Sequence, residues 1–157
     1  MVPTFAFEPH KGFGPAILGS PREDARAAMA LAGFPMKHSR KRSDYFCDSA
    51  IQIESDESGV VQFVGVAYSA RFNATYRGVG VFSIGAEQLF HLIAAADSTG
   101  AHVFDASEYR FPGQIMTLWQ ADTQYDYLGS ESRLVWAQVG LGNERYLASI
   151  SKILRRS

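Results

Sequence analysis

The chain has 157 residues, of which 46% are hydrophobic, 13% aromatic and 20% charged. Domains commonly have roughly 100–200 residues, so this composition predicts one globular domain over residues 1–157 and excludes disordered and fibrous classes. The 15 Lys and Arg residues against 16 Asp and Glu residues give a net charge of -1. No overall field therefore attracts nucleic acid or an anionic membrane.

The N-terminal residues and the cysteine content favour a reducing compartment. Met1–Glu8 lacks the basic and apolar regions of a secretory signal. No apolar run reaches the roughly 18 residues that cross a bilayer, so we expect no membrane partner and a cytoplasmic location. Cys47 is the only cysteine, which excludes an intrachain disulfide, and we expect it to be a small buried hydrophobe.

The first half of the chain predicts one helix followed by strands. Ser20–Glu23 has the pattern of a capping box, and apolar residues recur at helical spacing until Gly33, which predicts a helix over 21–32 with solvated arginines. A basic loop, Lys37–Arg42, follows it. Strands are expected at 44–46, 50–54 and 60–66, the last two forming a hairpin.

The second half predicts the same order of elements. Leucine, phenylalanine and isoleucine at helical spacing predict a helix over 86–96, with Ser83 as its cap. The polar segment Ala121–Ser132 is expected to be a loop. Asn143 is expected to cap a last helix over about 144–155. Strands are expected at 109–111, 115–119 and 134–139.

A glycine pair, a helix and a group of strands thus occur twice, starting near Gly12 and near Gly78. The residues of the two halves match poorly, so the similarity concerns only the order of elements. The pattern predicts an α+β fold with an antiparallel sheet, helices packed on one face, and two weak helix-plus-strands repeats.

No motif predicts a cofactor, a metal site or a catalytic site. Gly14–Gly19 has the glycine spacing of a phosphate-binding loop, but Ser20 and Pro21 stand where that loop needs Lys and Ser or Thr. The histidines are dispersed, without metal-box spacing. Glu87 and His91 lie one helical turn apart and leave a hydrolase as a third hypothesis, although such pairs are usually surface contacts.

Two charged segments are candidate contact sites. Lys37–Arg42 offers cations for a phosphate or acidic partner, but acidic residues follow at once and no aromatic residue interleaves, so nucleic acid is not the expected partner. A second segment combines tyrosines with carboxylates, a mixture that suits protein recognition. The predicted partner-binding residues are Asp122, Tyr125, Asp126, Tyr127 and Glu131. Trp119 and Trp136 lie in apolar strands and are expected in the core.

Several short motifs resemble those of small bacterial proteins, some of which look like immunity proteins encoded beside secreted toxins. The similarity covers most of the chain up to about Asn143, and it involves structural glycines, prolines and strand residues. The motifs are Pro9–Pro15, Leu18-Gly19, Ala32–Pro35, Ile51–Val61, Phe111–Ile115, Leu118-Trp119 and Leu134–Val139. The order of elements also resembles the β-lactamase-inhibitor-like fold, in which one sheet face carries helices and the other binds a protein.

The resemblance implies a non-enzymatic binding protein, an immunity protein that neutralises a cognate toxin by covering its active site. It transfers no catalytic residue to this chain. The alternative is a small-ligand-binding or homodimeric assembly module with no toxin partner. Fold does not decide between these functions.

Overall fold

The structure, a computed structural model, describes residues 2–105, 107–125 and 132–156. These residues form three helices and two mostly antiparallel sheets, which confirms the α+β class with an antiparallel sheet. In this part of the chain, no helix is both long and apolar enough to cross a membrane.

The large sheet has eight strands in the order β10-β11-β12-β13-β7-β6-β5-β4. The central strands β7 and β13 pair antiparallel, with Gly65 opposite Gly140, and a four-stranded antiparallel meander extends from each of them. Its strands are β4 (Met36–Arg40), β5 (Ser43–Phe46), β6 (Ile51–Ser55), β7 (Val61–Val66), β10 (Val103–Asp105), β11 (Glu108–Phe111), β12 (Met116–Tyr125) and β13 (Ser132–Gly142).

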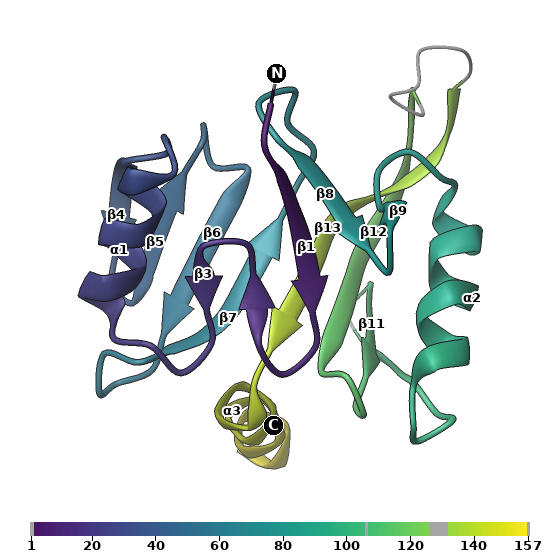
Figure 1. Cartoon of the computed structure of the whole chain (residues 1–157). Coiled ribbons are helices and arrows are strands. Elements are labelled where there is room, and N and C mark those ends of the chain that lie inside the picture. The colour runs from purple at the N-terminus through teal and green to yellow at the C-terminus, as the bar shows by residue number, and fades with distance from the viewer. Residues whose placement is uncertain (1, 106, 126–131, 157) are drawn as a thin grey trace.

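The small sheet has the order β3-β2-β1-β8-β9 and contains one parallel pair, β1 with β8. Figure 1 shows this sheet in front of the large one, with α1 (Arg22–Leu31) on its left and α2 (Ala86–Ala96) on its right. The helix α3 (Glu144–Arg156) lies at the lower end. The small strands are β1 (Thr4–Glu8), β2 (Gly12–Phe13), β3 (Ala16–Ile17), β8 (Asn73–Tyr76) and β9 (Val79–Gly80).

The core fills the space between the two sheets and beneath α1 and α2. Phe5 of β1 contacts the rings of Phe13, Phe34 and Phe72 at centroid distances of 5.7, 5.8 and 6.0 Å. Burial of large aromatic side chains supplies much of the hydrophobic stabilisation of a domain this small. The aromatic cluster therefore joins the small sheet to the segment that follows α1 and to the segment that precedes β8.

The predicted helix over 21–32 is confirmed to within one residue at each end, but its predicted cap is wrong. Pro21 is the N-cap residue, and the Ser20 hydroxyl donates to the Ile17 carbonyl at 2.7 Å, away from the helix. The Glu23 carboxylate accepts from Arg26 at 2.8 Å. The helix start is held by tertiary contacts, since the Arg22 amide donates to the carbonyl of Gly59.

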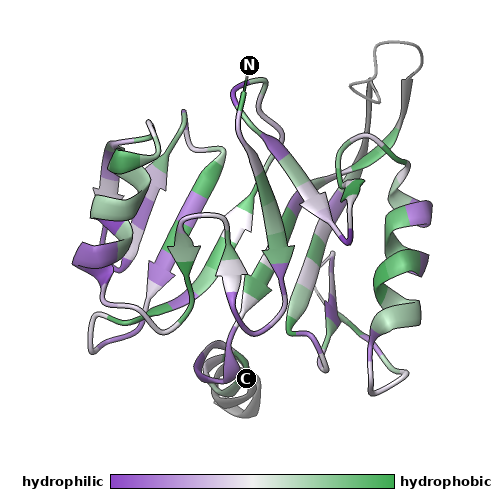
Figure 2. Cartoon of the chain, viewed as in Figure 1, coloured by the Kyte–Doolittle hydropathy of each residue, from purple (hydrophilic) through white to green (hydrophobic). Residues whose placement is uncertain are grey.

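The arginines of α1 are not solvated as predicted, because they bind a buried carboxylate of β5. Asp44 is 1% exposed and accepts two hydrogen bonds each from Arg22 and Arg26, at 2.8–3.0 Å. Burial by itself raises the pKa of Asp44, but the hydrogen bonds from the two guanidinium groups outweigh it and hold the pKa well below its usual value. Figure 2 shows this first turn of α1 as hydrophilic.

The second helix lies where it is predicted, over Ala86–Ala96, but Ser83 does not cap it. Gly85 is the N-cap residue, and its amide donates to Gln88 Oε1 at 2.9 Å. The hairpin of β6 and β7 is also confirmed. The predicted loop over 121–132 is wrong at both ends, because β12 continues to Tyr125 and β13 begins at Ser132.

The last helix begins as predicted. The Asn143 side chain accepts from the Tyr146 amide at 3.2 Å, as an N-cap does. Arg145 binds Asp56 in the β6–β7 turn at 2.7 Å, and the Tyr146 ring stacks on Phe63 of β7 with centroids 4.4 Å apart. These contacts attach α3 to the face of the large sheet that bears Phe63.

Polar side chains gather next to Tyr146 on that face. Burial, followed by the charges of Glu108 and Glu54, raises the pKa of the Tyr146 phenol well above its usual range. Among the described residues, the buried atoms Gln62 Oε1 and Arg110 Nε have no hydrogen-bond partner. This face is therefore polar, whereas the opposite face of the sheet forms the core.

We expect Asp44→Asn to lower the free energy of unfolding by about 2–3 kcal/mol, less than the loss of a fully buried pair because both arginines are partly exposed. The depressed pKa means that Asp44 stabilises the fold fully above its ordinary pKa and loses this effect as the pH falls below it. The difference in the free energy of unfolding between Asp44→Asn and the wild type, measured by urea titration, should therefore shrink as the pH falls toward 2.

Glu23→Gln is the matched control, since it weakens an exposed ion pair with Arg26, which also binds Asp44. We expect it to change the free energy of unfolding by less than about 0.5 kcal/mol. Equal effects of the two variants would contradict a stabilising role for the buried carboxylate.

Candidate protein-binding surface

Large apolar side chains are exposed at one corner of the large sheet, on the strands β10, β12 and β13. Val103, Phe104, Trp119 and Leu134 expose 43%, 59%, 39% and 53% of their surface. The rings of Phe104, Tyr109 and Trp136 line one hollow, and Leu134 lines a second hollow with Tyr109 and Trp136. We call Phe104, Tyr109, Leu134 and Trp136 the apolar corner. Val103 and Trp119 pair with Arg110 and Glu108, which alternate with Tyr109 along β11, so their side chains lie on the other face of the sheet. Trp119 is thus not a core residue as predicted, whereas Trp136 is buried.

Register and ring contacts position the apolar corner on the sheet. Phe104 of β10 is opposite Tyr109 of β11, with ring centroids 4.5 Å apart, and Tyr109 contacts Trp136 of β13 at 5.9 Å. The Trp136 indole donates to the Ala86 carbonyl at 2.9 Å. This bond ties the start of α2 to β13, so the corner is built on regular elements of the fold.

Two hollows flank the shared rings of Tyr109 and Trp136. One, of about 320 Å³, lies between those rings and α2, where Phe90 and Leu134 also line it. The other, of about 340 Å³, is lined by the rings of Phe104, Tyr109 and Trp136 and by Ser107, Gln120 and Ala121. A protein surface with protruding side chains can insert into such hollows, which favours specific contacts.

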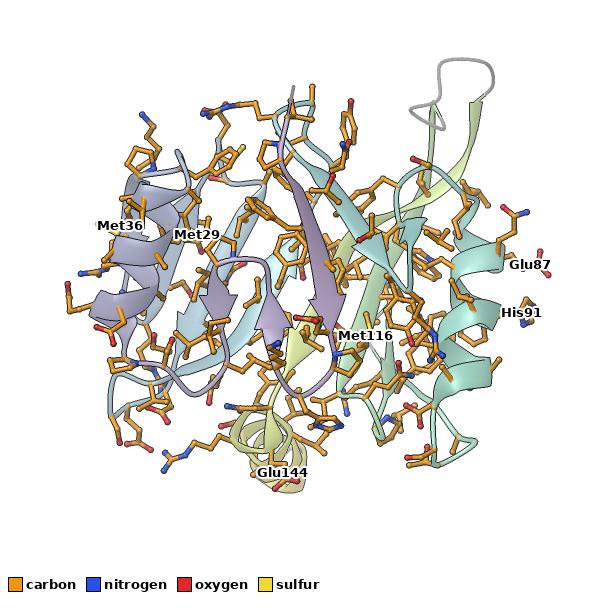
Figure 3. All side chains as sticks on the ribbon, in the orientation of Figure 1. Met29, Met36, Glu87, His91, Met116 and Glu144 are labelled. Atoms are coloured by element: carbon orange, nitrogen blue, oxygen red, sulfur yellow. The ribbon has the colours of Figure 1, made fainter. Side chains whose placement is uncertain are left out.

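Glu87 and His91 lie at the rim of the first hollow. The Oε1 atom of Glu87 is 3.6 Å from Nε2 of His91, and the two side chains are 89% and 70% exposed. Figure 3 shows both pointing away from the sheet, on the outer side of α2. Because both side chains are largely exposed, water screens the interaction between them.

The predicted partner-binding residues are close in sequence to the apolar corner. The backbones of Asp122 and Tyr125 belong to β12, opposite Val135 and Ser132 of β13, whereas their side chains lie outside the described part of the chain. Asp126, Tyr127 and Glu131 lie outside the described residues altogether. In the sequence, residues 126–131 connect the two strands.

The other candidates from the sequence lie elsewhere. The basic segment Lys37–Arg42 is not a simple loop, because most of it forms β4, an edge strand whose five residues are all exposed. The Gly19 amide donates a hydrogen bond to the Val61 carbonyl, so this amide of the Gly14–Gly19 segment is not available to bind a phosphate. Cys47 is buried, as predicted, with its sulfur 3.4 Å from the Ser69 hydroxyl.

A third hollow, of about 360 Å³, opens beside the small sheet. Four Ser and Thr residues contribute to its lining, together with three aromatic residues. The Ser and Thr residues are Thr4, Ser69, Thr75 and Ser83, and the aromatic residues are Tyr68, Phe72 and Phe82. Such a lining suits a small neutral polar molecule better than a charged one, because no carboxylate and no basic side chain lines this hollow.

Sequence reasoning missed most of the apolar corner. The only local signal was the pair Val103-Phe104, two apolar residues among polar ones. The strand that contains this pair, β10, has three residues, which are too few for alternation to predict a strand. Phe104 and Tyr109 are far from Leu134 and Trp136 in the sequence, and the sheet brings them together.

Neither a metal site nor a known relative helps to define a function. The described residues contain no group of three or more His, Cys, Asp or Glu side chains that could hold a metal ion. Comparison of the chain with protein-family models, curated proteins and solved structures finds no significant match. The geometry of the site is therefore the basis for a functional proposal.

The two kinds of aromatic residue at the corner should differ in their effect on stability. We expect Trp136→Ala to lower the free energy of unfolding by about 3–5 kcal/mol, because it leaves a cavity and removes the hydrogen bond to the Ala86 carbonyl. Phe104→Ala should lower the free energy of unfolding by no more than about 0.5–1 kcal/mol, since the Phe104 ring is largely in water. Chemical denaturation monitored by circular dichroism measures both, and a large loss for Phe104→Ala would mean that its ring serves the fold.

Proposed function

We propose that the chain is a non-enzymatic binding protein that neutralises a protein toxin, with the apolar corner as its contact surface. The observation that carries this proposal is the grouping of Phe104, Tyr109, Leu134 and Trp136 around two adjoining hollows, with Phe104 and Leu134 more than half exposed. Such patches mark interaction sites, and their aromatic residues commonly dominate the binding energy. The resemblance to immunity proteins supports a bacterial toxin as the partner and the cytoplasm as the place of binding.

The mechanism is occlusion of the toxin's active site. A contact of standard size buries about 800 Å² on each partner. The apolar corner supplies its centre, and the β12–β13 hairpin, which projects beyond β11 in Figure 1, extends the surface. Rigid strands present these side chains with little loss of entropy, which favours tight binding.

We also infer that the chain consists of two helix-plus-strands units with their helices on one face of the large sheet. Each half of the chain contains short paired strands, a helix and a four-stranded meander, in that order. The meanders meet at β7 and β13, and α1 and α2 lie on the same side in Figure 1. This arrangement supports duplication of one unit.

The hollow beside the small sheet supports a second candidate function, binding of a small polar ligand. Its hydroxyl groups and aromatic rings can hydrogen-bond and stack on a neutral molecule. A homodimeric module is the other form of this alternative. Both alternatives require no toxin, so identification of the partner separates them from the leading proposal.

Removal of apolar side chains from the corner should weaken partner binding without unfolding the protein. We expect the double variant Phe104→Ala/Leu134→Ala to bind the partner at least tenfold more weakly, because each large side chain contributes about 1–2 kcal/mol to the centre of a contact. The partner is captured from the native organism with the wild-type chain, and its affinity is then measured with the purified proteins.

Leu31→Ala is the matched control, because Leu31 is 91% exposed but belongs to α1, on the opposite side of the small sheet. We expect this control to bind like the wild type and to restore growth of cells that express the captured toxin. Equal affinity of the double variant and the control would reject the apolar corner as the contact surface.

The predicted tyrosines provide a separate test of the hairpin. We expect Tyr125→Ala/Tyr127→Ala to weaken the complex by about tenfold, since tyrosines give large contact areas at low entropic cost. Calorimetric titration with the purified partner measures this loss. An unchanged affinity in a folded double variant would exclude these two side chains and leave the apolar corner as the tested surface.

A further inference from the structure

The position next to β12 in the large sheet is occupied along only part of that strand. β11 pairs with β12 from Phe111↔Met116 to Glu108↔Trp119 and then turns away toward β10. β12 continues to Tyr125 and pairs with β13 on its other side. No described residue pairs with residues 121–125 on the side that β11 leaves, and Figure 1 shows the hairpin extending past β11.

The free side of this segment has backbone groups for another strand. In an antiparallel ladder, alternate residues direct their N–H and C=O groups to opposite neighbours, so a strand paired on one side retains such groups on the other. The Gln120 amide donates to the Ser107 carbonyl at 3.1 Å. This bond closes the ladder with the β10–β11 turn, and the open segment starts at the next residue.

The other sheet edges are protected or short. β4, at the opposite edge of the large sheet, has a register shift between Met36 and His38 and carries Lys37 and Arg40. Bulges and charged side chains are the usual means of preventing unwanted strand pairing. The outer strands of the small sheet, β3 and β9, have two residues each. Over residues 121–125, the outer edge of β12 has no register shift, and its one charged residue is the acidic Asp122.

The chemistry around the open edge selects the kind of strand that fits. The hollow of about 340 Å³ at its lower end is lined by Phe104, Tyr109 and Trp136, and it can take an apolar side chain. The sequence segments 103–109 and 119–125 contain Asp105, Glu108 and Asp122 and no Lys or Arg, so they are acidic. A basic segment with alternating apolar residues complements both features.

We propose that a basic, extended segment of the protein partner adds as a strand to the outer edge of β12 over residues 121–125, in the position that β11 leaves open. This inference rests on the proposed function, because it describes how the toxin engages the apolar corner. Main-chain hydrogen bonds would supply affinity, and alternate side chains would supply specificity.

A synthetic peptide with alternating Lys and Val residues, seven residues long, serves as the probe on the full chain. We expect it to slow hydrogen exchange of amides within 120–125 at least tenfold, as measured by NMR. A peptide with Glu in place of Lys should bind at least tenfold more weakly. Two N-methylated peptides give the sharpest test, one methylated on the Lys amides and one on the Val amides. These amides point to opposite edges of the strand, so only the peptide whose methyl groups face away from β12 should bind.

Variants of the chain separate charge from strand pairing. We expect Asp122→Lys to weaken binding of the Lys-Val peptide at least threefold, whereas the same substitution at Glu57, an exposed carboxylate in the β6–β7 turn, should not. The proposal is overturned if both N-methylated peptides bind equally, or if protection falls on β4 and spares 120–125. Concentration-dependent protection without peptide, with a dimer in sedimentation, would assign this edge to a second copy and also overturn it.

The two proposals can fail independently. If the captured partner binds through Phe104 and Leu134 but leaves exchange at 120–125 unchanged, strand addition is wrong and the binding function remains. If the peptide protects this edge but Phe104→Ala/Leu134→Ala retains full affinity for the partner, the apolar corner is not the contact surface.

Discussion

The pairing of β7 with β13 is the interaction on which the rest of the structure depends. It joins two four-stranded meanders into one sheet, and Gly65 lies opposite Gly140 at this joint. A Cβ on Gly140 would lie 2.5 Å from Cζ of Phe63 and would also clash with Thr117. The absent side chain allows the Phe63 ring to lie across the joint, where Tyr146 of α3 stacks on it.

β13 also connects the core with the candidate surface. Val139 and Leu141 are fully buried at the joint, whereas Leu134, nearer the other end of the strand, is exposed at the apolar corner. The buried part of β13 fixes the position of the apolar corner relative to the core. The hydrogen bond from Trp136 to the Ala86 carbonyl also attaches the corner to α2. Rigid presentation lowers the entropic cost of binding, so the fold favours recognition by shape over adaptation.

The sequence predicted elements whose signal is local and failed where pairing decides. α2 was predicted with its observed bounds because its buried residues, among them Leu89 and Ile93, recur at helical spacing. The extensions of β12 and β13 were predicted as loop, because Ala121–Tyr125 has polar residues and no alternation. These residues are strand because β13 lies opposite them, which no local pattern encodes. The apolar corner was missed for the same reason, since its members come together only in the sheet.

The contrast between the two edges of the large sheet bears on function more than on stability. An open strand edge and exposed aromatic rings promote aggregation, and proteins usually remove such features when nothing requires them. β4 has the common protection, a register shift and positive charge. Residues 121–125 of β12 have no register shift and no positive charge, and Phe104, which is 59% exposed, lies beside the start of this segment. This contrast between the two edges supports the proposal that the open edge is a contact site.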